Sequence, residues 1–118
     1  MDNQHESIAE ALESIEAAVT ICDADLKLLY MNEKSASGYG GAEAAPKPGY
    51  DLSACHKPES VAKMREILSS GAPNVYTITK KGTKKLIWQG PWKTEGKVAG
   101  LVEISIVLPP SMPHFDRG

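Results

Sequence analysis

Cysteine is scarce in this sequence. Only Cys22 and Cys55 occur among 118 residues, too few for a disulfide framework. We therefore expect both thiols to be reduced and the protein to be cytoplasmic. A long apolar run is also missing, since none approaches the roughly 20 residues that a membrane helix needs. The N-terminal stretch MDNQHESIAE is polar and acidic, unlike a secretory signal. We expect no membrane partner.

An excess of basic residues is missing too. The chain has 13 lysines and arginines against 15 acidic residues, and its net charge is −2. Nucleic-acid-binding domains normally carry a basic excess, so we expect no nucleic-acid partner. Four lysines flank one predicted turn, and we interpret them as a solvated turn rather than an anion site: Lys80, Lys81, Lys84 and Lys85.

Length and composition fit one globular domain. The chain is 42% hydrophobic and 24% charged, which is ordinary for such a protein. A chain of this length buries roughly two thirds of the surface that its unfolded form exposes, so it needs no disulfide or metal to fold. We predict a single domain over residues 1–118, with a core at 8–109 and an irregular, proline-rich tail at 110–118. A complete short protein and an excised domain fit this sequence equally well.

The N-terminal part predicts a helix over residues 7–18. Ser7 and Glu10 have the spacing of a capping box, which would start the helix at Ser7. Apolar residues recur at helical spacing and form one stripe, Ile8, Leu12 and Ile15.

A β-hairpin is predicted next, with strands at 19–22 and 26–31 around an acidic turn. The second strand ends directly at Asn32. Asparagine is a favoured N-cap, and Glu33 would then lie near the positive end of the helix dipole. The sequence therefore predicts a short helix over 33–37, ended by Gly38.

The second half predicts a loop, a longer helix and three strands. The loop covers residues 38–51, which are rich in glycine and proline, and the helix covers 58–68. The strands follow at 75–79, 85–89 and 97–108, with a turn at 92–96 before the last. In the last strand we expect the longer apolar row to face the core, Val98, Val102, Ile104, Ile106 and Leu108. Its opposite side would then place Ala99, Leu101 and Val107 on the outer face of the sheet.

Five strands with helices grouped between them indicate an α+β fold. Their order resembles that of the PAS domain, a sensor fold. DADLKLLYMN at 23–32 looks like the PAS hairpin that leads to an asparagine, and SVAKMREIL at 60–68 looks like its longer helix. The segments GTKKLIWQGPW and GKVAGLVEISIVLP look like its last two strands.

This resemblance implies a five-stranded antiparallel sheet in the order 2-1-5-4-3, with an N-terminal helix and the other helices on one face. It also implies a central pocket, because PAS domains bind haem, flavin or small metabolites. Many dimerise through the first helix. We therefore expect a homodimer built on the N-terminal helix and the outer sheet face.

Pocket residues are predicted between the sheet and the helices: Tyr30, Cys55, His56, Met64, Tyr76 and Trp88. Thiolate and imidazole are both possible metal or haem ligands. In haem-binding PAS domains, however, the axial histidine lies on the longer helix, and here His56 precedes it. We therefore favour packing roles for Cys55 and His56 over haem ligation by His56. No metal site is predicted, and flavin is not expected because no Asn-Cys-Arg-Phe-type motif is present.

Two functions remain. The first is a non-catalytic sensor that binds a small molecule and passes the signal through dimer or partner contacts. The second is an interaction module with a filled core and no ligand. An enzyme is not expected, because no nucleophile-base pair, clustered acid-base set or metal motif is evident. Any output would pass to a separate protein, such as a kinase or a regulator.

Overall fold

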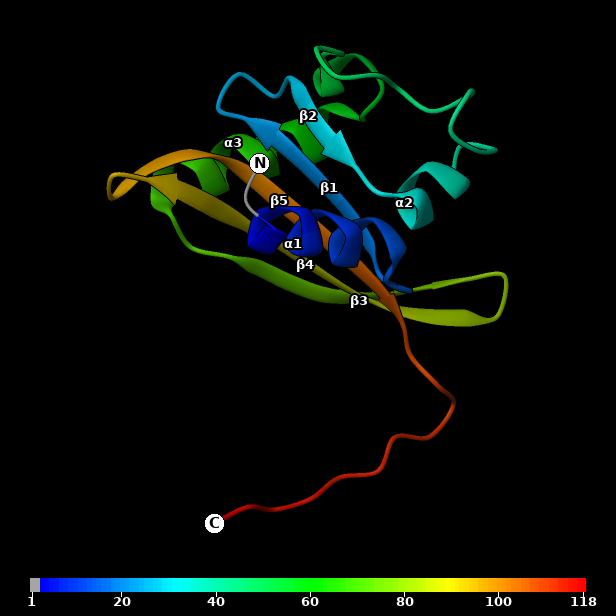
Figure 1. The fold of residues 1–118 in the computed structure, drawn as a ribbon. Helices are drawn as coiled ribbons and strands as arrows, with labels where there is room; N and C mark the ends of the chain where they lie inside the picture. The colour runs from blue at the N-terminus through cyan, green and yellow to red at the C-terminus, as the bar shows by residue number, and fades with distance from the viewer. Residues whose placement is uncertain (1–2) are drawn as a thin grey trace.

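A five-stranded antiparallel sheet forms the centre of the computed structural model, which describes residues 3–118 (Figure 1). The strand order is β2-β1-β5-β4-β3, which confirms the predicted order. The strands are β1 (Ala18–Asp23), β2 (Leu28–Met31), β3 (Asn74–Lys80), β4 (Thr83–Thr94) and β5 (Lys97–Val107).

Helices lie on both sides of this sheet. In Figure 1, α1 (Asn3–Ser14) crosses in front of the sheet, and α3 (Pro58–Ser70) lies behind it. A short helix, α2 (Glu33–Ser37), follows β2, and a 3₁₀ turn, η1 (Leu52–Ala54), precedes α3. We call the side that α3 covers the inner face and the side of α1 the outer face. No helix among residues 3–118 is long and apolar enough to cross a membrane.

The main core lies between the inner face and α3. Met64 and Ile67 are the buried residues of α3, spaced to share one side of the helix. They pack in a cluster whose other members come from the hairpin, η1 and β5: Cys22, Leu26, Leu28, Leu52 and Leu101. This packing fixes α3 against the middle of the sheet.

The expected faces of β5 were reversed. Leu101 belongs to the inner core and is 5% exposed, whereas Ile106 is 41% exposed. Alternation shows which residues of a strand share a face, but it does not say which face meets the main core. In this chain the longer apolar row lies on the outer face.

The helix α1 begins and ends earlier than predicted. Ser7 lies inside it, and the Ser7 hydroxyl donates to the carbonyl of Asn3, so the capping box at Ser7 and Glu10 is wrong. No residue of α1 is buried. Ile8 is 52% exposed, so the apolar stripe that predicted the helix is largely uncovered.

The strand β4 runs through the predicted turn at 92–96 and reverses only at Glu95 and Gly96, both with positive φ. Its continuation includes Pro91, which pairs with β5 beyond the last β3–β4 pair, Asn74 with Gln89. A proline is tolerated there because this part of β4 lies at the sheet border.

Candidate functional site

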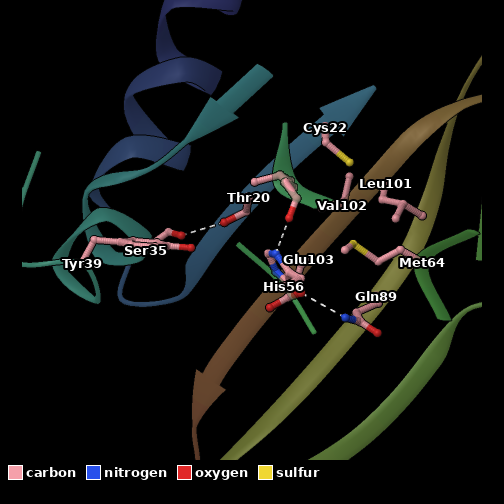
Figure 2. A pocket seen from close by; sticks show the side chains of 11 residues that line it. Thr20, Cys22, Ser35, Tyr39, His56, Met64, Gln89, Leu101, Val102 and Glu103 are labelled. Carbon is pink, nitrogen blue, oxygen red and sulfur yellow. Dashed lines mark hydrogen bonds between the residues drawn. The ribbon is translucent and has the colours of Figure 1, made fainter. Parts of the chain in front are cut away.

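A cavity of about 200 Å³ lies on the inner face, enclosed by the sheet, α2, η1 and α3 (Figure 2). Its walls combine apolar side chains with several polar ones. The lining residues are Thr20, Cys22, Ser35, Tyr39, Leu52, His56, Met64, Gln89, Leu101, Val102 and Glu103.

A chain of side-chain hydrogen bonds crosses the sheet beside this cavity. The amide of Asn74 donates to Gln89 Oε1 over 3.0 Å, and Gln89 Nε2 donates to Glu103 Oε2, also over 3.0 Å. Figure 2 shows the second of these bonds joining β4 to β5. Because Asn74 holds the Gln89 oxygen, the amide of Gln89 is oriented toward Glu103.

The other polar walls come from β1 and from the helical segments on this face. The hydroxyls of Thr20 and Ser35 lie 2.6 Å apart and share a hydrogen bond between β1 and α2. His56 Nδ1 lies 2.7 Å from the carbonyl oxygen of Leu52. A carbonyl can only accept, so Nδ1 carries the proton and donates it. In the neutral ring, Nε2 is then an acceptor.

The carboxylate of Glu103 influences the groups around it. Burial raises the pKa of the Cys22 thiol, and the negative charges of Asp23 and Glu103 raise it further. The pKa of Tyr39 is raised by burial first and then by nearby negative groups that include Glu103. The pKa of Tyr76 is raised by the same two causes, burial and then Glu103. All three groups therefore stay protonated near neutral pH.

The structure brings two of the six predicted pocket residues, His56 and Met64, to the cavity. Cys55 is exposed, and its sulfur lies 3.2 Å from His56 Nδ1 without lining the cavity. Tyr76 lies in a separate shallow depression with Lys63 and Gln89, at the start of α3.

Tyr30 and Trp88 do not line this cavity, contrary to the sequence prediction. The Tyr30 hydroxyl donates to Glu13 of α1 over 2.7 Å. Trp88 pairs with Ile104 across β4 and β5, next to Gln89, whose side chain is on the inner face. Neighbouring strand residues point to opposite faces, so Trp88 lies on the outer face.

Sequence reasoning missed five polar residues of the cavity: Thr20, Ser35, Tyr39, Gln89 and Glu103. Alternation groups Glu103 with Leu101, on the side of the last strand that was expected to lie outside. The sequence does not say that α3 covers this side, so it carried no signal for the place of Glu103 in the cavity.

Haem and flavin do not fit the residues of this cavity. His56 has Nε2 as the atom that could ligate a metal, but the volume of about 200 Å³ is small. Sites for drug-sized ligands span roughly 300–1,000 Å³. Haem and flavin are at least as large as such ligands, so this cavity is too small for either. Among residues 3–118 no group of three or more histidine, cysteine or acidic side chains is placed to hold a metal ion.

No protein-family model and no curated protein matches this sequence. Solved structures do match, at low sequence identity. The PAS domain of Bordetella pertussis BvgS aligns with a TM-score of 0.63 and 16% identity, covering 92% of this chain and 88% of that one.

Two proteins of Vibrio cholerae are also similar. A sensory box sensor histidine kinase has a TM-score of 0.59 and 14% identity, covering 91% of this chain and 94% of that one. VqmA bound to DPO has a TM-score of 0.68 and 16% identity, covering 90% of this chain and 58% of that one. At such identities the match concerns the arrangement of the backbone.

Proposed function

We propose that this chain, which has the PAS fold, is a sensory signalling domain that binds a small molecule in the inner-face cavity. The observation that carries the proposal is the set of polar side chains gathered in that cavity. Glu103, Gln89 and His56 converge there from β5, β4 and the segment before α3. Convergent polar groups in a concave, partly enclosed site are typical of ligand recognition.

The similar structures support a sensory role. One belongs to a sensor histidine kinase, and another is a receptor-type protein, VqmA, bound to the small molecule DPO. By analogy this chain passes its signal to a separate output protein, such as a kinase or a regulator. We place it in the cytoplasm as a single domain, in keeping with its two free cysteines, Cys22 and Cys55.

The signal is passed on through a homodimer in this proposal. Ile8 of α1 and Ile15, directly after that helix, are exposed, and the outer face exposes Val75 and Ile106. A second copy that covered α1 and this face would bury apolar side chains that the single chain leaves in water. A stable interface of this kind buries roughly 1,200–2,000 Å² in total.

The domain is non-catalytic in this proposal. Cys55 and His56 are adjacent, with the sulfur 3.2 Å from Nδ1. That nitrogen already donates its proton to the carbonyl of Leu52, so it cannot accept a proton from the thiol. This adjacent thiol and imidazole therefore lack an available base.

One observation favours a second candidate function. At about 200 Å³, the cavity is smaller than the roughly 300–1,000 Å³ typical of ligand sites. A domain whose cavity holds only water would act as an interaction module, through the same α1 and outer face.

Native mass spectrometry of the purified chain, followed by NMR titration with a library of small fragments, tests the proposal. We expect added mass that is lost on denaturation, or fragments that shift the signals of Gln89, Leu101 and Glu103. Shifts confined to α1 and β3 would place binding elsewhere. A protein that binds no fragment but still dimerises would support the interaction module instead.

A further inference from the structure

The charged residue that lines the inner-face cavity is an acid, and no lysine or arginine balances it. Glu103 is the cavity's only acidic lining residue. Across residues 3–118 the ion pairs of the structure lie elsewhere, and none includes Glu103. The cavity therefore contains a carboxylate without a cationic partner. Placing a charge in a partly enclosed site is costly unless a partner or hydrogen bonds compensate for the lost water.

The hydrogen bonds made by Glu103 leave room for a ligand. Gln89 donates to Oε2 of Glu103, and no bond to Oε1 is found among the described residues. A carboxylate can accept about four hydrogen bonds, so most of its capacity is unused. Gln89 cannot turn around to offer its oxygen instead, because Asn74 already donates to that oxygen.

The remaining polar walls offer acceptors and some neutral donors, such as the hydroxyl of Tyr39, but no lysine or arginine. His56 uses its Nδ1 proton on Leu52, which leaves Nε2 as the acceptor of the neutral ring. Thr20 and Ser35 use one of their two hydroxyl protons on each other. Anionic ligands need cationic or multiple N–H donors, and the lining residues provide neither lysine nor arginine. A carboxylate or phosphate ligand would instead meet Glu103 and be repelled.

The apolar walls and the size limit the rest of the ligand. Leu52, Met64 and Leu101 supply an apolar surface beside these acceptors. A water molecule takes up roughly 30 Å³ of liquid, so about 200 Å³ corresponds to a molecule of only several heavy atoms. The site suits one short apolar body with one group that donates hydrogen bonds.

We propose that the cavity recognises a small organic cation, a primary amine or an amidine, whose N–H groups donate to Glu103. Its apolar body packs on Met64 and Leu101. The assignment rests on the proposed function of the cavity as a ligand site and names the chemical class of that ligand. A charged hydrogen bond between ammonium and carboxylate is roughly twice as strong as a neutral one, so the cation is preferred over a neutral molecule of equal size.

Three probes of matched shape test the assignment: benzylamine, benzyl alcohol and benzoate. Binding to the full chain is measured by isothermal titration calorimetry and by NMR shifts at Glu103 and Leu101. For fragments of this size a Kd on the order of 1 mM is expected. We expect benzylamine to bind about tenfold or more tightly than benzyl alcohol, and benzoate to give no measurable binding.

The substitution Glu103→Gln keeps the shape and removes the charge. We expect it to lower benzylamine affinity to the level of benzyl alcohol and to leave benzyl alcohol unchanged. Glu95→Gln, at the exposed β4–β5 turn, is the matched control and should alter neither. Unfolding midpoints of both variants check that the fold is retained.

The outcomes separate the two proposals. Binding of benzyl alcohol or benzoate at the cavity, with no preference for benzylamine, would overturn the cation assignment and leave the ligand site standing. If Glu103→Gln binds benzylamine as tightly as the parent does, the cation assignment is likewise overturned and the ligand site is retained. If none of the three probes shifts any cavity signal, the assignment fails, and a negative fragment library as well would remove the ligand site itself.

Discussion

The side-chain amide of Asn32 donates a hydrogen bond to the carbonyl oxygen of Leu12 over 2.8 Å, across 20 positions of the chain. The same nitrogen donates to the carbonyl of Ala17 over 2.8 Å. The side-chain oxygen accepts from the amides of Val19 and Ser35. Through these bonds Asn32, which is completely buried, joins the end of α1, the start of β1 and the start of α2.

Asn32→Ala should therefore cost more than the loss of a helix cap. A cap alone is worth about 1 kcal/mol, and each buried group left without a partner adds roughly 1–3 kcal/mol. We expect the free energy of unfolding to fall by at least about 3 kcal/mol in denaturant titration. Asn74→Ala, which removes one bond to Gln89, is the control and should cost much less. A loss for Asn32→Ala of only about 1 kcal/mol would mean that the cap alone matters.

Tyr30 should report the contact between α1 and the sheet. Burial and the hydrogen bond to Glu13 raise the pKa of Tyr30 from 10.0 to about 12. A raised folded pKa means that this stabilisation is complete below pH 10 and is lost as the pH rises from 10 toward 12. We expect unfolding experiments over this range to show a steeper loss of stability for the parent than for Tyr30→Phe.

Tyr50→Phe serves as the comparison for Tyr30→Phe, because among residues 3–118 no hydrogen bond joins Tyr50 to α1. It should keep the parent's pH dependence. Identical alkaline slopes for the parent and Tyr30→Phe would show that the bond to Glu13 is not formed in solution.

Gly100 should not tolerate a side chain. A Cβ atom at this position would lie 1.9 Å from the carbonyl oxygen of Cys22 and 2.5 Å from Trp92 Nε1. Those two atoms are themselves hydrogen-bonded over 2.9 Å. We expect Gly100→Ala to lower the free energy of unfolding by about 2 kcal/mol or more and to change the fluorescence of Trp92.

Gly38→Ala is a matched control for Gly100→Ala. Gly38 has a φ of −66°, and its added Cβ would meet only the carbonyl of Ser35, at 3.3 Å. Its effect should stay below about 1 kcal/mol. Equal costs for the two alanine variants would contradict the close approach of β1, β4 and Gly100.

The homodimer is testable with two neighbouring residues of β5. Ile106 and Val107 are 41% and 47% exposed, but they point to opposite faces of the sheet. Ile106→Glu places a charge on the outer face and should shift the protein toward monomer in sedimentation velocity. Val107→Glu carries the same charge on the inner face and should leave the dimer intact. If the parent protein is monomeric at micromolar concentration, the proposed interface is rejected. If only Val107→Glu dissociates the dimer, the interface lies on the inner face instead.

The order of the strands was predictable because it follows from local patterns and the resemblance that they support. The N-cap at Asn32 was predictable for the same reason, since its contact with Ser35 spans three residues. Its bonds to Leu12 and Ala17 were not, because they depend on where α1 lies in space. The end of α1 at Ser14, rather than at residue 18, is visible only with those contacts.

The cavity was less predictable than the sheet. Alternation in β4 and β5 places Trp88 and Gln89 on opposite faces of the sheet, and likewise Leu101 and Val102. The sequence does not say which of the two faces meets α3. The aromatic Trp88 was assigned to the pocket, and the side of β5 that carries Leu101 was assigned to the outer face. Both assignments follow average preferences for burial, and a polar binding cavity departs from those averages.

Pro91 has a consequence for how copies of the chain can meet. From Gly90 to Thr94, β4 pairs with β5 alone, so one long side of this segment is open to another strand. A strand laid there would receive no N–H from Pro91, which weakens growth by strand addition. At the opposite border, Leu28 already exchanges hydrogen bonds with Gly49 and Tyr50. The Gly90–Thr94 segment and the β2 border are thus guarded against strand addition, whereas the free side of β3 (Asn74–Lys80) has no proline, so it is the border at which another strand could still pair.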